Sequence, residues 1–289
     1  MVCCVRSEDV LARLNESRFV RSIGLPLLKA LNRDISIRHH WSDHTVKLSL
    51  FAHKGYWFHG RRREAEEMEA IRALVAPGDF VVEVGGHIGY ISLWFAECAG
   101  RGTGCRVTVF EPGSNNLPYI RENVRGIEHI TLIEKGCGSK AGQLEFFEDN
   151  LTGQNNSFVA SFEGLRANID AAPNVDIQIS KHTVDVVRLD TELADAVPDF
   201  VKIDVEGFEF PVLRGANGWF GPGKKPPIIM IEVQADHEEI ANWMLERDYS
   251  LFDIHGGEVT AIPHSTLNLF ALNREHHAGP LARWQNRPN

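Results

Sequence analysis

The sequence predicts an α/β fold in which a seven-stranded, mostly parallel sheet carries helices on both faces, behind an N-terminal cap of helices and a strand pair. Two observations support this. The chain has 289 residues, of which 43% are hydrophobic and 24% charged, so it can bury a large core and is not disordered as a whole. From residue 77 onward, short apolar strands alternate with helical segments, which is typical of a parallel sheet.

The first 76 residues read as the cap. Residues 8–32 have helical periodicity that is interrupted at Gly24-Leu25-Pro26. A strand pair follows, and then an amphipathic helix that Pro77 ends, because proline cannot continue a helix. These last elements are strands 35–41 and 45–52 and helix 61–75.

Residues 77–275 form the predicted main domain, and residues 276–289 a C-terminal tail. Five core strands are interleaved with helices, and an antiparallel pair closes the sheet. A β-rich insertion at about 144–187, with strands at 144–147, 175–179 and 184–189, interrupts the alternation. The expected core strands are 80–84, 106–110, 130–134, 200–203 and 228–232, the closing pair 250–254 and 267–272, and the helices 88–99, 117–124 and 238–247.

Charge and cysteine content exclude several classes of protein. With 30 Lys+Arg against 39 Asp+Glu, the net charge is −9, which argues against a nucleic acid partner. No stretch approaches the ~18 uncharged apolar residues of a membrane span. The first residues carry charge at once and are not those of a signal peptide. Five cysteines without Cys-x-x-Cys spacing argue against a disulfide framework or a zinc site, so we expect a cytoplasmic protein. A homo-oligomer remains open.

A glycine turn joins the first core strand to its helix in Val82-Glu83-Val84-Gly85-Gly86-His87-Ile88-Gly89. Glycine there allows a tight turn and a close approach of a ligand. The Gly-x-Gly-x-x-Gly pattern of a nicotinamide site is not met, because His87 and Tyr90 stand at its second and third glycine positions. Glu83, beside the turn, would repel a pyrophosphate but can attract an ammonium group.

The second core strand ends in Phe110-Glu111-Pro112. An acid at this point is where nucleotide-binding α/β folds hold a ribose diol. One carboxylate can accept hydrogen bonds from both ribose hydroxyls. The glycine turn and Glu111 together predict a nucleotide-type cofactor.

A third motif, Val201-Lys202-Ile203-Asp204-Val205-Glu206-Gly207-Phe208-Glu209, is followed by Val212-Leu213-Arg214-Gly215. With the glycine turn and Phe110-Glu111-Pro112, it resembles the FkbM family of S-adenosylmethionine-dependent methyltransferases over about residues 78–272. The first loop departs from the family's Asp-x-Gly-Ala-Asn at Glu83, Gly86 and His87.

The resemblance implies a class I methyltransferase fold, Rossmann-like, in which residues 77–275 bind S-adenosylmethionine. It implies that Glu83 and Gly85 face the methionine moiety, Glu111 the ribose, Cys137 the adenine edge, and Asp204 the reacting methyl group. The cofactor-binding residues it predicts are Glu83, Gly85, Gly86, Gly89, Glu111, Pro112, Cys137 and Asp204.

Asp204 and Glu206 are the predicted catalytic residues, because an alcohol must lose its proton as it is methylated. Glu232 ends the next strand and can also point into the cleft, whereas Glu209 reads as structural. The alternative route is a Mg²⁺ ion shared by Asp204, Glu232 and Glu206; we favour the metal-free route and assign no metal ligand.

Four further segments have bland interpretations beside a functional one. Gln154-Asn155-Asn156-Ser157 is either an ordinary surface loop or a loop over the active site. Arg61-Arg62-Arg63 reads as the solvated start of a helix, and the alternative is a basic spot that could meet an acidic acceptor. His39-His40 and His276-His277 read as surface pairs.

The predicted function is S-adenosylmethionine-dependent O-methylation of a hydroxyl on a small-molecule or glycan acceptor: a sugar, glycoconjugate or polyketide-type compound. The acceptor class follows from the resemblance. The alternatives are a nicotinamide-dependent oxidoreductase and a non-catalytic nucleotide-binding module on the same fold.

Overall fold

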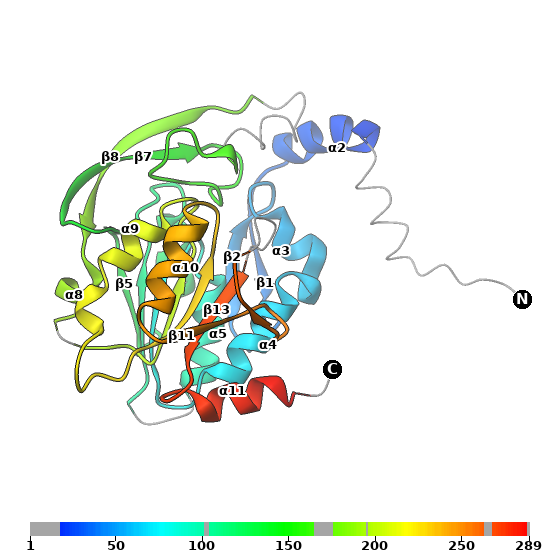
Figure 1. Ribbon diagram of the computed structural model, residues 1–289. Coiled ribbons are helices and arrows are strands. Elements are labelled where there is room, and N and C mark those ends of the chain that lie inside the picture. The colour runs from blue at the N-terminus through cyan, green and yellow to red at the C-terminus, as the bar shows by residue number, and fades with distance from the viewer. Residues whose placement is uncertain (1–17, 101–103, 165–175, 195, 263–267, 288–289) are drawn as a thin grey trace, which may run out of the picture.

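A computed structural model describes residues 18–100, 104–164, 176–194, 196–262 and 268–287, and the side chains from residue 24 onward. The main sheet has the strand order β12-β11-β13-β10-β9-β3-β4-β5 (Figure 1). Its strands are β3 (Phe80–Val84), β4 (Arg106–Phe110), β5 (Ile130–Ile133), β9 (Phe200–Ile203), β10 (Ile228–Glu232), β11 (Tyr249–Phe252), β12 (Glu258–Val259) and β13 (Asn268–Asn273). The seven predicted strands are confirmed, and the two-residue β12 adds an edge that the sequence did not indicate.

Strands β5, β4, β3, β9 and β10 pair in parallel, whereas β13 is antiparallel to both β10 and β11. The chain fills one side of β3 with β4 and β5, and then crosses to the other side for β9 and β10. Ligands of open α/β sheets bind at the carboxyl ends of the strands where the order reverses. The topology therefore places a site at the ends of β3, β4 and β9.

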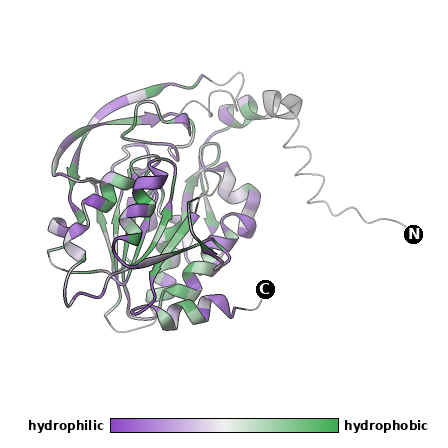
Figure 2. Cartoon of the chain, viewed as in Figure 1, coloured by the Kyte–Doolittle hydropathy of each residue, from purple (hydrophilic) through white to green (hydrophobic). Residues whose placement is uncertain are grey.

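Alternate residues of the buried strands contribute to two hydrophobic cores, one on each face of the sheet. Val81 belongs to the core that α4 (Ala65–Leu74), α5 (Tyr90–Ala99), α6 (Leu117–Asn123) and α11 (Ala278–Gln285) cover. Val82 belongs to the core beneath α9 (Glu209–Arg214) and α10 (His237–Leu245). The short helix α8 (Leu189–Glu192) contributes Leu189 to that second core. Hydrophobic residues run along the central strands in Figure 2, so the predicted layers are confirmed.

The cap consists of α2 (Arg18–Ala30), the antiparallel pair β1 (Asp34–Arg38) and β2 (Thr45–Ser49), α3 (Lys54–His59), a 3₁₀ turn and α4. Helix α2 runs through Pro26, where the sequence indicated a break, and Leu25 and Leu28 pack it against Phe51 and Leu151. Residues 8–17 of the predicted helix lie outside the described residues. Val46 and Leu48 share a core with Val81, while the domain boundary at residue 76 stays a prediction.

The insertion forms a second sheet with the order β6-β8-β7. Its strands are β6 (Gly136–Cys137), β7 (Gly142–Asp149) and β8 (Ile179–Val187). The predicted strand 144–147 is a short piece of β7, and the predicted strand 184–189 covers the end of β8 but runs on into α8, which begins at Leu189; β7 and β8 pair antiparallel along their lengths. The predicted strand 175–179 is wrong over residues 176–178, which are not in a strand, and only its last residue, Ile179, belongs to β8; residue 175 lies outside the described residues. Most of β8 is solvent-exposed, so it lacks the apolar alternation that would have indicated its length.

Two of the predicted surface histidines are buried. His39 donates from Nε2 to the Tyr90 carbonyl (3.0 Å), and His277 donates from Nε2 to the Pro226 carbonyl (2.9 Å). His277 belongs to the predicted tail, which contains α11 with its buried Trp284. Local sequence could not reveal these distant carbonyl partners. Among the described residues, no helix combines the length and apolarity that crossing a bilayer requires.

Candidate functional site

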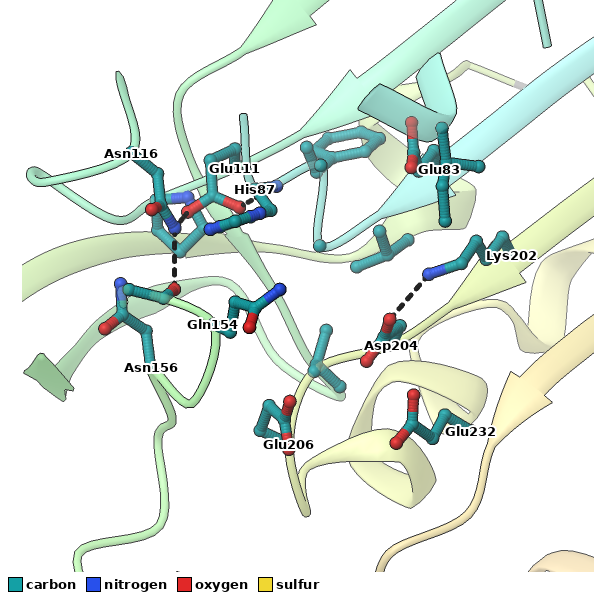
Figure 3. Close-up of a pocket in the computed structure, with 18 of the residues that line it drawn as sticks. Glu83, His87, Glu111, Asn116, Gln154, Asn156, Lys202, Asp204, Glu206 and Glu232 are labelled. Atoms are coloured by element: carbon teal, nitrogen blue, oxygen red, sulfur yellow. Dashed lines mark hydrogen bonds and ion pairs between the residues drawn. The ribbon is translucent and has the colours of Figure 1, made fainter. Parts of the chain in front are cut away.

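A pocket of about 250 Å³ opens at the carboxyl ends of β3, β4, β9 and β10 (Figure 3). Figure 3 shows Glu111, His87 and Asn116 gathered at one end, and Asp204, Glu206 and Glu232 at the other. Of the predicted site residues, those that line the pocket are Glu83, Gly85, Gly86, Glu111, Pro112, Cys137, Asp204 and Glu206, together with Glu232. Gly89 and Glu209 do not belong to the lining. The structure thus brings most of the predicted residues together, and their individual roles stay predictions.

The glycine turn lies directly on the ends of two strands. Gly85 has φ +91°, and a Cβ there would lie 1.8 Å from the Asp204 carbonyl oxygen. A Cβ at Gly86 would lie 2.3 Å from Cγ1 of Val109. Both glycine amides donate to the Phe110 carbonyl, so the turn offers a ligand its bare surface rather than these two amides. Gly89, with φ +83°, directly precedes α5, and its predicted role in cofactor binding stays a prediction.

His87 locks this turn to the cap and to the insertion. Its φ of +49° is rare for a residue other than glycine. The Tyr56 hydroxyl donates to Nδ1 (3.1 Å), and Nε2–H donates to the Thr152 carbonyl (3.3 Å). Burial lowers the pKa of His87 to about 3, so the ring is neutral and both nitrogens are used. His87, where this chain departs from the family pattern, is therefore held in place by two hydrogen bonds of its own.

Glu111 is 4% exposed and accepts three hydrogen bonds. The amides of His87 (2.7 Å) and Gly113 (2.8 Å) donate to it, as does Nδ2 of Asn116 (3.2 Å). A carboxylate has about four acceptor positions, so one remains, on the oxygen that His87 contacts. Oδ1 of Asn116 is buried and has no hydrogen-bond partner in the described part of the chain. Two acceptors at this end thus suit two ribose hydroxyls.

Lys202, at 4% exposure, lies among carboxyl groups at the floor of the pocket. Its Nζ donates to Asp204 Oδ2 at 2.7 Å. Burial alone would lower the pKa of Lys202, but Asp204 and Glu83 outweigh it and raise that pKa above its ordinary value. Burial also raises the pKa of Glu83 to about 8, although Lys202 and the hydroxyl of Ser92 oppose the shift. The floor is a buried network of one cation and several acids.

Glu206 and Glu232 share the opposite end with Asp204. Burial, and then the charge of Asp204, raise the pKa of Glu206; for Glu232 the charge of Asp204 comes first and burial second. Glu206 has φ +55°, and the Ser157 hydroxyl donates to its carbonyl at 2.6 Å. Ser157 is fully buried in the insertion. The loop with the predicted catalytic acids is therefore held by the insertion.

The polar segment 154–157 covers the pocket, as the functional interpretation predicts. Gln154, Asn155 and Asn156 line it, and Gln154 lies between the two ends in Figure 3. Cys137, 1% exposed, lies in the lining beside Phe158. The Cys137 thiol and the Phe158 ring give this part of the lining apolar surface, which suits an adenine edge.

Several lining residues were not assigned to the site from the sequence, among them Tyr56, Arg63, Asn116 and Lys202. Lys202 left a signal, because a charged residue stands within the buried strand Phe200–Ile203. Arg63 is not simply the solvated start of a helix, because its guanidinium lies over the Tyr56 ring at 4.3 Å and pairs with Glu64 (2.9 Å). No local pattern shows that the cap folds over the pocket.

These residues fit S-adenosylmethionine. Glu111 and Asn116 offer acceptors for the ribose, the glycine surface leaves room beside Glu83 for the methionine part, and Cys137 lies where the adenine edge is expected. Within the described residues, no three His, Cys, Asp or Glu side chains are grouped as metal ligands. Asp204 is instead paired with Lys202.

Comparison with known proteins assigns the family. A profile described as the methyltransferase FkbM domain matches residues 83–251, more than half of the chain. Curated protein sequences give no significant match.

Solved structures give distant matches. An FkbM methyltransferase from Methylobacillus flagellatus is 18% identical, with a TM-score of 0.44, over 77% of this chain and 53% of that one. The chain thus spans about half the length of that protein. A precorrin-6Y C5,15-methyltransferase from Geobacter metallireducens is 11% identical (TM-score 0.41; 73% and 88% covered). An S-adenosylmethionine-dependent O-methyltransferase from Thermotoga maritima is 12% identical (TM-score 0.40; 72% and 64% covered).

The family match argues against the alternative of a nicotinamide-dependent oxidoreductase. It agrees with the absence of the Gly-x-Gly-x-x-Gly pattern at the glycine turn. It spans the glycine turn, Glu111 and the Asp204–Glu206 segment, which the structure joins in one pocket. The chain belongs to the FkbM family of S-adenosylmethionine-dependent methyltransferases.

Proposed function

We propose that the protein methylates a hydroxyl oxygen of a sugar, glycoconjugate or polyketide-type acceptor. S-adenosylmethionine, bound in the pocket, supplies an electrophilic methyl group. The chain must then align the acceptor hydroxyl and take its proton. The residues that would hold the cofactor are those predicted, from Glu83 and Gly85 to Glu111, with Asn116 as an addition.

The observation that supports an oxygen acceptor is that Asp204, Glu206 and Glu232 lie together at one end of the pocket. A carboxylate with a raised pKa binds a proton more tightly, and a general base works best when its pKa approaches the working pH. Asp204 is ion-paired with Lys202, which occupies one of its oxygens. Glu206 makes no such ion pair among the described residues. Burial and the charge of Asp204 raise the pKa of Glu206 to about 10, and the positive charges of bound S-adenosylmethionine would lower that pKa toward the working pH, at which Glu206 can take a proton.

In this proposal Glu206 takes the acceptor proton, and Asp204 carries a fixed negative charge near the transferred methyl group. Ser157 sets the position of Glu206 through its backbone. The alternative keeps a Mg²⁺ ion between Asp204 and Glu232 that lowers the pKa of the acceptor hydroxyl. The metal-free route remains our preference, because Lys202 already occupies one side of Asp204.

The test is transfer of a ¹³C-labelled methyl group from S-adenosylmethionine to a panel of hydroxyl-bearing glycosides and polyketides. We expect a methoxy carbon in the product by NMR, at a rate that is unchanged by EDTA. Glu206→Gln should lose turnover and retain cofactor binding. Glu209→Gln is the matched control, since Glu209 is a buried acid outside the pocket lining.

Two results would contradict this proposal. A labelled methyl group found on nitrogen or carbon in every product would refute the oxygen acceptor. Turnover that EDTA abolishes and Mg²⁺ restores would instead assign proton removal to a metal-bound acceptor.

A further inference from the structure

A second hollow, of about 350 Å³, lies between α2, α3 and the loop that contains Gln154. Leu25 and Leu28 of α2 form one wall, and Trp57 and Phe58 of α3 form the other. We call it the cap groove. Its size is at the lower end of small-molecule sites, which span about 300–1,000 Å³.

The cap groove adjoins the cofactor pocket. Gln154 lines both. Helix α3 separates them, with Tyr56 in the pocket lining and its neighbours Trp57 and Phe58 in the groove lining. At Gly55, in the groove, a Cβ would lie 2.5 Å from Nη1 of Arg63, which lines the pocket. The two hollows are therefore neighbours on either side of α3.

Leucine and aromatic side chains give the cap groove apolar walls, and two of the polar groups in its lining are hydrogen-bonded within the protein. Trp57 donates from Nε1 to the Leu50 carbonyl at 2.9 Å. The Thr152 carbonyl accepts from His87. Phe58 remains 38% exposed, so its ring adds accessible apolar surface to the cap groove.

We infer that the acceptor carries an apolar part, a ring system or a short alkyl chain, which binds in the cap groove while its hydroxyl reaches past Gln154 into the cofactor pocket. This inference rests on the proposed function, and it selects amphiphilic acceptors over bare sugars. Gln154 lines both hollows, so a ligand held in the groove lies next to the cofactor pocket, and this adjacency is why we assign the groove to the acceptor.

The test uses 1-alkanols from butan-1-ol to octan-1-ol as probes, titrated by ligand-observed NMR into the full chain with S-adenosylhomocysteine bound. We expect the affinity to rise about threefold to fourfold with each methylene, as for transfer of CH₂ out of water. Leu28→Gln and Phe58→Ser should each weaken octan-1-ol binding at least tenfold. Because Leu28→Gln could also disturb the packing of α2, Phe58→Ser in α3 provides an independent test of the groove.

The matched controls are Leu27→Gln and Leu31→Gln. Leu27 lies in α2 and Leu31 directly follows it; these leucines are 59% and 61% exposed and do not line the groove. We expect both to bind octan-1-ol within twofold of the wild type. Calorimetric titration with S-adenosylhomocysteine should give the same affinity in all four variants, which shows that the cofactor pocket is intact.

Absence of alkanol binding, affinity independent of chain length, or an equal loss in Leu31→Gln would overturn the inference. Affinity that falls as the protein concentration rises would assign the groove to a contact between two copies, and would overturn it too. Methyl transfer to a hydroxyl is measured separately, so a failure here is distinguishable from a failure of the proposed function.

Discussion

At the scale of single residues, the site depends on charges that the fold has removed from water. Lys202 stands in a strand whose other residues are apolar, and it is the cation among Glu83, Asp204 and Glu232. The sequence shows the unusual lysine, but not its partners, because Glu83 and Glu232 come from other strands. The acids at strand ends could be predicted since parallel strands end at one edge; the buried network could not.

We predict that Lys202→Met lowers the free energy of unfolding by about 3–5 kcal/mol at pH 7.5, because it leaves buried carboxylates without their cation. Urea unfolding followed by circular dichroism measures this. The control is Lys181→Met, which removes an ion pair with Glu145 whose two side chains are 57% and 60% exposed, and should change stability by less than about 1 kcal/mol. Equal stability of Lys202→Met and the wild type would refute the network.

Glu83 predicts a pH dependence. Its pKa is about 8 in the folded protein and near 4.5 when unfolded, so the native state binds its proton more tightly, and stability falls as pH rises from about 4.5 to 8. Between pH 7 and 8, Glu83→Gln should reduce this fall by up to about 1 kcal/mol per pH unit. The buried histidines are the same in the variant and the wild type, so their contribution to the pH dependence cancels in the comparison. Parallel stability curves for variant and wild type, measured in urea, would contradict the assignment.

At the scale of elements, the buried strands are the best-predicted part of the chain. The predicted ranges 80–84, 106–110, 200–203 and 228–232 coincide with β3, β4, β9 and β10, because each is a short apolar run between turn residues. Helix α3 was missed, since Lys-Gly-Tyr-Trp-Phe-His is too short for helical periodicity. The lengths of β7 and β8 come from their pairing with each other, which a local pattern does not contain.

The glycine turn gives the sharpest prediction at this scale. Gly85→Ala would drive a Cβ into the Asp204 carbonyl, so we expect loss of S-adenosylhomocysteine binding and a lower melting temperature. The control is Gly126→Ala, which shares a positive φ (+77°) but has open space around its Cβ. It should cost only the backbone strain, of order 1–2 kcal/mol, and leave binding intact. Normal binding by Gly85→Ala would show that the turn does not lie against β9 as described.

At the scale of the whole molecule, three parts of the chain close one site. The cap supplies Tyr56, the main domain supplies His87, and the insertion supplies Thr152, and two hydrogen bonds join them. Sequence reasoning located the cofactor end but not this closure, because it depends on contacts between segments that are distant in the chain. The cytoplasmic location, the possible homo-oligomer and the domain boundaries stay predictions.

The central claim is that the pocket at the ends of β3, β4 and β9 binds S-adenosylmethionine, and calorimetric titration with S-adenosylhomocysteine tests it most directly. The account predicts one site per chain, no binding of NAD⁺, and an affinity reduced at least tenfold in Glu111→Gln. That variant keeps the shape of the side chain but loses the charge facing the ribose. Saturable binding of NAD⁺ in place of S-adenosylhomocysteine, or full affinity in Glu111→Gln, would contradict the account.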